Sequence, residues 1–270
     1  MRILVCVKQV PDTTEIKIDP VKNTLIRDGV PSIVNTFDAY ALEVAARIKD
    51  NDPSTKITLL SMGPAQAKDA LRECLAKGGE EAYLCTDRKF GGSDTLATSY
   101  ILSTAIQQIE KEKGEKFDLI LCGKQAIDGD TGQVGPEIGS HLGIPQLTYI
   151  SEITETAADH IVGKRESDQG YDLISVQLPA VVTIVKTPFD PRFPKLKDTM
   201  RARKTEIKEI TFEDVKDIID ETRIGLKGSP TKVRKTYTPQ RNKECLMIKE
   251  EDAKADAAKL VTLLSDAKLL

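Results

Sequence analysis

The residues best suited to chemistry in this sequence lie in one stretch, residues 119–136, which reads LILCGKQAIDGDTGQVGP. An apolar run stops at Gly123, and glycines recur at 129, 132 and 135 beyond a polar loop. Such glycines let backbone N–H groups approach an anion, and a helix start adds its positive dipole end. The stretch predicts a phosphate cradle at the carboxyl end of a parallel strand. The alternative is an ordinary loop with turn glycines, because the chain has no G-x-G-x-x-G and no Walker A lysine.

Other residues with chemical potential give weaker signals. Of the two histidines, His141 falls on the helix after the cradle, where packing or capping explains it, and His160 lies in a polar turn. Asp128 and Asp130 have no third carboxylate or histidine nearby, so we expect no metal site and a role in the loop or in ligand contact. The sequence therefore predicts a binding site rather than an acid–base dyad.

Composition limits the class of protein. The chain has 270 residues, 40% hydrophobic and 30% charged, with a net charge of -3, which suits a large globular domain and predicts no nucleic-acid partner. Its five cysteines include no C-x-x-C pair, which predicts a reducing compartment rather than a disulfide framework. The first residues enter a strand without a signal peptide or spanning segment. We expect a cytoplasmic protein with no membrane insertion.

Strands and helices alternate over the first 122 residues. Apolar runs predict parallel strands, and periods of three and four predict helices. The expected strands are 3–7, 56–60, 81–85 and 117–122, the expected helices run through 37–48, 64–75 and 94–109, and a β-hairpin is inserted at 15–28. This rhythm implies right-handed crossovers and a doubly wound, mostly parallel α/β sheet.

The pattern changes in the second half. Residues 161–165, 172–177 and 180–184 are strand-like, with a turn at 168–170. Beyond residue 188 the chain is rich in charge and poor in apolar residues until an amphipathic helix at 253–264. Such a tail is not expected to build its own core. We therefore divide the chain into an α/β domain, 1–188, and an extended C-terminal arm, 189–270, which is either partly disordered or wrapped on another subunit.

Six blocks of sequence resemble one family. They are LVCVK at 4–8, NTFD at 35–38, SMGPAQ at 61–66, GKQAID at 123–128, LPAVVT at 178–183 and Pro191-Arg192. Their order and spacing resemble the β subunit of electron transfer flavoproteins along nearly the whole chain. The resemblance implies an adenine-nucleotide-hydrolase-like, Rossmann-like fold that associates with an α subunit carrying a redox-active FAD.

The resemblance also implies a nucleotide pocket at the carboxyl ends of the strands. Carried over by position, its residues are Cys6, Asn35, Thr36, Phe37, Asp38, Met62, Gly123, Lys124, Gln125, Ala126, Ile127, Asp128, Gly129, Asp130, Thr131, Gly132, Gln133 and Val134. Core packing is the alternative for Met62, and a helix cap is the alternative or additional role for Asn35.

The family contains two types of β site. One type holds AMP as a structural element, and the electron-bifurcating type holds a second FAD that accepts hydride from NADH. VPDTT at 10–14, DTLATS at 94–99 and DGDTGQVGP at 128–136 resemble the second type, and the small Thr131 and Gly132 leave room for FAD. The resemblance then places Asp94, Thr95 and Thr98 beside the flavin or NADH, whereas a helix cap and a surface face are the alternative.

The bifurcating type implies electrons passing to ferredoxin or flavodoxin and, through the α-subunit FAD, to an acyl-CoA dehydrogenase. The segment 195–204 resembles the family's recognition loop, with Leu196 as the apolar anchor followed by Met200 and Arg201. A solvated basic loop is the alternative. The competing functions are a conventional carrier with AMP in this subunit and a stand-alone ATP-binding stress-type domain, against which the long tail argues.

Overall fold

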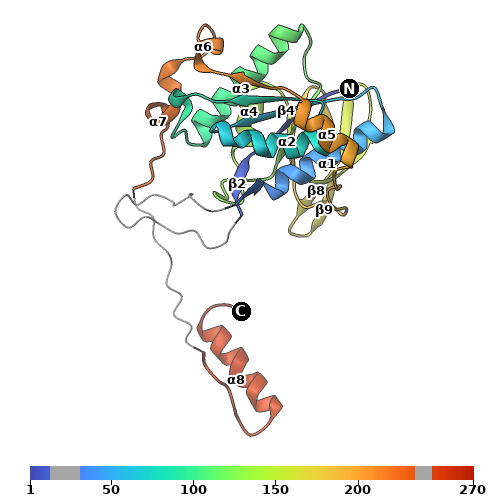
Figure 1. The fold of residues 1–270 in the computed structure, drawn as a ribbon. Coiled ribbons are helices and arrows are strands. Elements are labelled where there is room, and N and C mark those ends of the chain that lie inside the picture. The colour runs from blue at the N-terminus through green and yellow to red at the C-terminus, as the bar shows by residue number, and fades with distance from the viewer. Residues whose placement is uncertain (13–30, 235–244) are drawn as a thin grey trace. The chain divides into compact units, whose positions relative to one another are not determined.

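The computed structural model describes residues 1–12, 31–234 and 245–270 (Figure 1). A nine-stranded sheet is the framework of the larger of its two compact units. Residues 1–12 and 31–234 form this unit, and 245–270 belong to a second one. The strand order is β11-β5-β4-β1-β6-β10-β7-β8-β9, and a separate two-stranded sheet pairs β2 with β3. The predicted hairpin at 15–28 lies outside the described residues.

The strands of the large sheet are β1 (Arg2–Cys6), β4 (Lys56–Met62), β5 (Glu81–Cys85), β6 (Leu119–Gly123), β7 (Gln146–Thr156), β8 (His160–Ser167), β9 (Gly170–Gln177), β10 (Ala180–Ile184) and β11 (Ile207–Ile210). The small sheet consists of β2 (Gln9–Pro11) and β3 (Ser32–Val34). The helices are α1 (Thr36–Asn51), α2 (Lys68–Ala76), α3 (Thr95–Lys113), α4 (Val134–Leu142), α5 (Leu196–Lys204), α6 (Phe212–Val215), α7 (Gly225–Gly228) and α8 (Ala253–Asp266).

Seven strands, from β11 to β7, are parallel, and helices cover both faces of this part of the sheet. Their apolar runs follow from this double cover, because both sets of alternating side chains are buried. β6 and β10 are buried at every position. The predicted doubly wound α/β sheet is confirmed.

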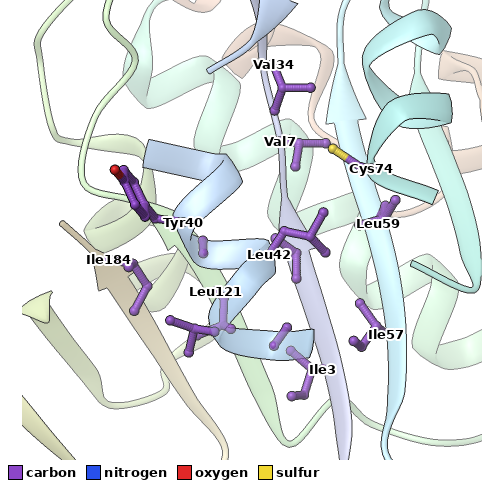
Figure 2. Close-up of a cluster of buried hydrophobic side chains, with 14 of the residues drawn as sticks. Ile3, Val7, Val34, Tyr40, Leu42, Ile57, Leu59, Cys74, Leu121 and Ile184 are labelled. Atoms are coloured by element: carbon purple, nitrogen blue, oxygen red, sulfur yellow. The ribbon is translucent and has the colours of Figure 1, made fainter. Parts of the chain in front are cut away.

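Two apolar clusters lie on opposite faces of the sheet. One joins α1, α2 and α5 to the sheet, and Figure 2 shows its centre, where Leu42 of α1 lies near Ile3 and Leu59 of the strands. The other joins α3 and α4 to the opposite face through side chains such as Ile106 and Ile138. Helices on both faces place the loops after neighbouring strands on opposite sides, which matters for the site below.

The sheet ends in an antiparallel ribbon. β7 pairs parallel with β10 but antiparallel with β8, and β8 pairs antiparallel with β9 across the turn that was predicted at 168–170. The predicted strands at 161–165, 172–177 and 180–184 are confirmed. The sequence analysis did not predict β7, because its outer half is exposed and carries little apolar alternation.

Residues 189–234 lie in the same unit as the sheet, so this unit ends at Arg234 and not near residue 188. β11 adds a parallel strand beside β5, and Ala202 and Ile207 join the apolar cluster on the α1 face. The few apolar residues of this segment extend an existing core instead of building a new one. The segment expected to be a recognition loop is largely helical, as α5.

The described part of the second unit contains α8, as the apolar spacing predicts. Asp252 caps its N-terminus by accepting a hydrogen bond from the N–H of Ala255 at 2.8 Å. None of its side chains is buried, and Leu260 and Val261 are exposed. Of the helices that the structure describes, none has both the length and the apolar composition needed to cross a membrane.

Candidate functional site

The predicted pocket lies at a point where the direction of strand addition reverses. From β1 the chain adds β4 and β5 on one side and then returns to add β6 on the other side of β1. The connection after β1, which includes β2 and β3, reaches α1 on one face, and the loop after β6 leads into α4 on the other face. Ligands of open α/β sheets bind in the crevice that such diverging loops leave outside the carboxyl ends of the strands.

The strand ends bring Cys6, Met62 and Gly123 to this edge. β1 pairs in register with β4 and β6, so Cys6 lies opposite Leu60 and next to the end of β6. Cys6 is 9% exposed and Met62 is half-buried, and both contact the apolar cluster on the α3 and α4 face. Packing thus accounts for most of the Met62 surface, and its outer part remains free at the edge.

Asn35 ties the two loops together. It occupies the cap position before α1, but its side chain makes no cap hydrogen bond. Instead its Nδ2 donates to the carbonyl of Gln125 at 2.8 Å, and its Oδ1 accepts from the N–H of Ile127 at 3.0 Å. Asn35 is fully buried. The side chain predicted to cap a helix or touch a ligand therefore holds the backbone of the loop after β6.

Asp38 lies one turn into α1 and connects the ends of β1 and β6. Its Oδ2 accepts a hydrogen bond from the N–H of Lys8 at 2.7 Å, and its Oδ1 accepts from the N–H of Gly123 at 3.1 Å. Residue 123 must be glycine here, because a β-carbon would collide with Oδ1 and with the backbone of Phe37. Burial raises the pKa of Asp38 to about 7, against the opposing effect of hydrogen bonds from Asn35 and from the two N–H groups.

The rim of the loop is held by polar contacts. The ammonium of Lys8 contacts both carboxylate oxygens of Asp128, at 2.7 and 3.0 Å, and Nε2 of Gln125 donates to Asp130 at 2.7 Å. Asp130 has a φ of 54°, in the left-handed region where a side chain is strained. Both aspartates therefore serve the loop structure. Among the described residues, no group of three or more His, Cys, Asp or Glu could hold a metal ion.

The three glycines of the loop differ in their surroundings. Gly132 has a φ of 65°, and a β-carbon on it would lie no closer than 3.5 Å to another residue, while Gly129 faces open space. A β-carbon on Gly135 would lie 2.6 Å from Cγ2 of Thr183, in β10. Gly132 is needed for its backbone conformation, whereas Gly135 permits close contact between α4 and the sheet. The space beside Gly135 is filled by Thr183 and is not open to a ligand.

Lys124, Phe37 and Tyr149 form a cluster beside the loop. The ammonium of Lys124 lies 5.4 Å from the ring centre of Tyr149 and 6.0 Å from that of Phe37, within cation–π range. Tyr149 has a φ of 61°, and its N–H donates to the hydroxyl of Thr183 at 3.1 Å. The sequence analysis missed Tyr149, which no motif marks. It also missed Lys8, whose position directly after an apolar strand could have identified it.

The remaining positions of the predicted pocket line the same loops. Thr36, Ile127, Thr131 and Gln133 are exposed, whereas Ala126 and Val134 are half-buried. At the start of α4 the N–H groups of Val134 and Gly135 have no acceptor within the helix, whereas Pro136 has no N–H and the N–H of Glu137 donates to the carbonyl of Gln133 at 3.0 Å. The chemistry of this donor set fits an anion, because the cradle offers backbone N–H groups and a helix N-terminus next to small residues.

The segment 94–98 meets the cradle through one residue. The hydroxyl of Thr95 donates a hydrogen bond to Oε1 of Gln133 at 3.1 Å. Asp94 caps α3 by accepting from the N–H of Ala97 at 3.1 Å, and its second oxygen accepts from the N–H and the hydroxyl of Thr231 at 2.9 and 2.7 Å. Thr98 is half-buried on the next turn. The carboxylate of Asp94 is thus engaged in tying residue 231 to α3.

The predicted docking residues do not all point outward. Leu196 and Met200 lie one turn apart on α5, 79% and 56% exposed, and Phe193 before them is 92% exposed. We call these three side chains the apolar docking patch. Arg201 instead donates to the carbonyls of Leu75 and Gly79 at 2.8 and 3.1 Å, at the end of α2. Its guanidinium stabilises the C-terminal end of that helix.

The histidines have structural surroundings. His141 packs edge-on against Tyr100, with ring centres 5.6 Å apart, and burial followed by the charge of Arg223 lowers its pKa. His160 contacts Asp159 at 2.8 Å, and this hydrogen bond raises its pKa. Neither ring lies among the residues that hold the loop after β6.

Comparison with known proteins identifies the family. The profile described as "Electron transfer flavoprotein domain" matches residues 22–215. "Electron transfer flavoprotein subunit beta" of Megasphaera elsdenii is 55% identical over 253 residues, 93% of each chain. "Caffeyl-CoA reductase-Etf complex subunit CarD" of Acetobacterium woodii is 44% identical over 270 residues, 100% of each chain. "Protein FixA" of Azotobacter vinelandii is 44% identical over 272 residues, 97% of this chain and 95% of its own.

Proposed function

This chain belongs to the electron transfer flavoprotein family as a β subunit, and on that premise we propose that the cradle after β6 binds FAD. A β subunit of this family has an α subunit as its partner. When bound, FAD supplies the capacity to take two electrons from NADH and to pass them on one at a time. The observation that carries the proposal is the open space at Gly129, together with the left-handed backbone of Gly132, directly before the N-terminus of α4.

The residues of this chain have distinct roles in the proposed site. The N–H groups at the start of α4 bind the pyrophosphate, and Asn35 keeps the loop in place through its bonds to the backbone of Gln125 and Ile127. Lys8 neutralises Asp128, which reduces the repulsion between the rim and a polyanion. Thr95, through Gln133, closes the side of the cradle that faces α3.

We further propose that the αβ complex bifurcates electrons in the cytoplasm. One electron from NADH goes to ferredoxin or flavodoxin, and the other goes through the α-subunit FAD to an acyl-CoA dehydrogenase. The name of the relative CarD, from a caffeyl-CoA reductase-Etf complex, supports an oxidoreductase acting on a CoA thioester as the partner. The apolar docking patch, Phe193, Leu196 and Met200, is the surface we assign to that partner, with the charged residues around it as a polar rim.

The nucleotide content of the purified αβ complex tests this function. Two FAD molecules per heterodimer are expected. Gly132→Ala should weaken the binding of one of them roughly fivefold to thirtyfold, because a β-carbon strains the left-handed backbone by about 1–2 kcal/mol. Gly143→Ala is the matched control. Gly143 also has a φ of 65° and open space around it, but it ends α4 away from the cradle. One FAD and one AMP per heterodimer would contradict the proposed FAD site and favour a conventional carrier.

For the C-terminal segment we propose that residues 245–270 lie on the α subunit. The exposed apolar side chains of α8, such as Leu260 and Val261, support this assignment. Amide hydrogen exchange in α8 should be fast in the isolated chain and slow in the αβ complex. Equal protection in both would refute the assignment without bearing on the FAD site.

A further inference from the structure

The carboxylate of Asp38 is the one polar group of the site that is charged, buried and adjacent to both loops of the cradle. It is 7% exposed, in the first turn of α1. Its hydrogen-bond donors are the N–H groups of Lys8 and Gly123, which follow β1 and end β6. The loop after β6 therefore begins, at Gly123, on a hydrogen bond to a carboxylate whose charge water screens poorly.

No ion pair among the described residues includes Asp38. The nearest cation is Lys8, but its ammonium binds Asp128 on the rim, so Asp38 receives only its backbone N–H. A buried carboxylate without a contacting cation is costly, and its protonated form is accordingly favoured. Burial raises the pKa of Asp38 to about 7, although hydrogen bonds from Asn35, Lys8 and Gly123 oppose this.

Two buried thiols interact electrostatically with Asp38, Cys74 on α2 and Cys122 on β6. Both have a pKa raised above that of an ordinary thiol, so neither is ionised near neutral pH. Burial is the main cause for Cys74, and the hydrogen bond with the Cys6 thiol is the main cause for Cys122. The ammonium of Lys8, on the β1 side, contacts Asp128.

We propose that Asp38 couples occupation of the cradle by an anionic nucleotide to the uptake of a proton. The inference rests on the proposed function, since it requires a nucleotide in this cradle. Phosphate groups beside a buried carboxylate favour its neutral form. A half-ionised Asp38 at about pH 7 therefore takes up roughly 0.5 proton per nucleotide bound, and the affinity for nucleotide falls as pH rises above neutral.

Isothermal titration calorimetry in buffers of different ionisation enthalpy measures this proton directly. FAD, whose pyrophosphate carries no proton that titrates in this range, is titrated into the full-length chain, alone and with its α subunit, from about pH 5.5 to about pH 8.5. In the wild type, the observed enthalpy should depend on the buffer with a slope near half a proton at about pH 7, decreasing toward acid pH, where Asp38 is already protonated. Asp38→Asn should bind without any dependence on the buffer.

A control variant separates Asp38 from the histidine on the neighbouring helix. His141→Asn removes the histidine on α4 and should keep the wild-type slope. Infrared difference spectra of the wild type supply a second measurement that needs no variant. They should show a protonated carboxyl band that grows on nucleotide binding.

The outcomes are distinct. Absence of binding in the wild type refutes the proposed function itself. Binding without a proton slope across the pH range, or without the infrared band, refutes the coupling but leaves the function intact. A slope that persists in Asp38→Asn assigns the proton to another group and overturns the inference, and its disappearance in His141→Asn would identify that group as His141.

Discussion

Gly135→Ala tests whether the glycine after the cradle serves packing or ligand binding. The new β-carbon would lie 2.6 Å from Cγ2 of Thr183 and 3.4 Å from the β-carbon of Cys122. Carbon atoms pack at about 3.5–4.0 Å, so α4 must move away from β10 by roughly 1 Å. Overpacking of this kind costs about 1–3 kcal/mol, of which the better helix propensity of alanine offsets up to about 1 kcal/mol.

Thr183→Ser provides a matched relief of the collision. Serine lacks the methyl group that the new β-carbon meets, and it keeps the hydroxyl that accepts from the N–H of Tyr149. Alone, this change loses one buried methyl group, at about 1 kcal/mol. In the double variant the alanine occupies the vacated volume, so the loss of stability should be smaller than the sum of the single losses by about 1–2 kcal/mol.

Urea unfolding of the full-length chain, followed by circular dichroism, gives the free energies for this double-mutant cycle, and nucleotide content is measured on the same αβ complexes. Thr183→Ser should restore both the stability and the nucleotide content that Gly135→Ala reduces. Additive free energies, within about 0.5 kcal/mol, would show that the two groups do not collide. A nucleotide loss in Gly135→Ala that Thr183→Ser fails to restore would show that residue 135 faces the ligand.

Three further predictions concern other contacts. Leu196→Ala should weaken binding to the proposed dehydrogenase partner roughly tenfold to a hundredfold, because truncating an anchor residue costs about 1–3 kcal/mol. The flavin content of the αβ complex should not change. If the rate of dehydrogenase reduction depends on dehydrogenase concentration as in the wild type, this prediction is wrong. Asp94→Asn leaves one acceptor oxygen, which cannot serve both the N–H of Ala97 and the N–H of Thr231. Amide hydrogen exchange at Thr231 should therefore become faster, and unchanged exchange would show that Asp94 does not hold residue 231 to α3. The guanidinium of Arg192 donates a hydrogen bond to Asp50 and so lowers the pKa of that carboxyl in the folded chain. This ion pair therefore stabilises the fold at pH values above the pKa that Asp50 has in the unfolded chain, and the stabilisation is lost as pH falls through the folded pKa. Arg192→Gln should therefore destabilise the chain more at neutral pH than at about pH 3, and an equal loss at both would refute the ion pair.

The fold follows from the sequence wherever burial decides it. The parallel strands are apolar runs because helices cover both faces of the sheet, and the glycine loops mark their ends. β11 and α5 escape such reasoning, because each contributes only one or two buried residues, such as Ile207 and Ala202, to a core that other elements build. In the sequence their charged residues resemble those of a solvated tail, because nothing there indicates that β11 pairs with the edge strand β5.

The candidate site is predictable in its location but not in its support. Glycine spacing and the alternation of elements bring the loop after β6 to the edge of the sheet. The partners of Asn35, by contrast, lie 90 and 92 residues away in the sequence, and those of Asp38 are backbone groups that no side-chain pattern reveals. Glu43 is a similar case, since a buried carboxylate in a helix has no visible reason until Arg192 contacts it.

These contacts all involve one helix, which gives α1 a larger role than the loop it supports. Its first two turns hold the cradle through Asn35 and Asp38, and its middle binds the guanidinium of Arg192 through Glu43 at 2.8 Å. Arg192 immediately precedes the apolar docking patch, which begins at Phe193. A hydrogen-bonded helix of 16 residues transmits position along its axis with little deformation. The same rigid element therefore positions the nucleotide site and the proposed partner surface, and the contact between Glu43 and Arg192 joins residues 149 positions apart in the sequence.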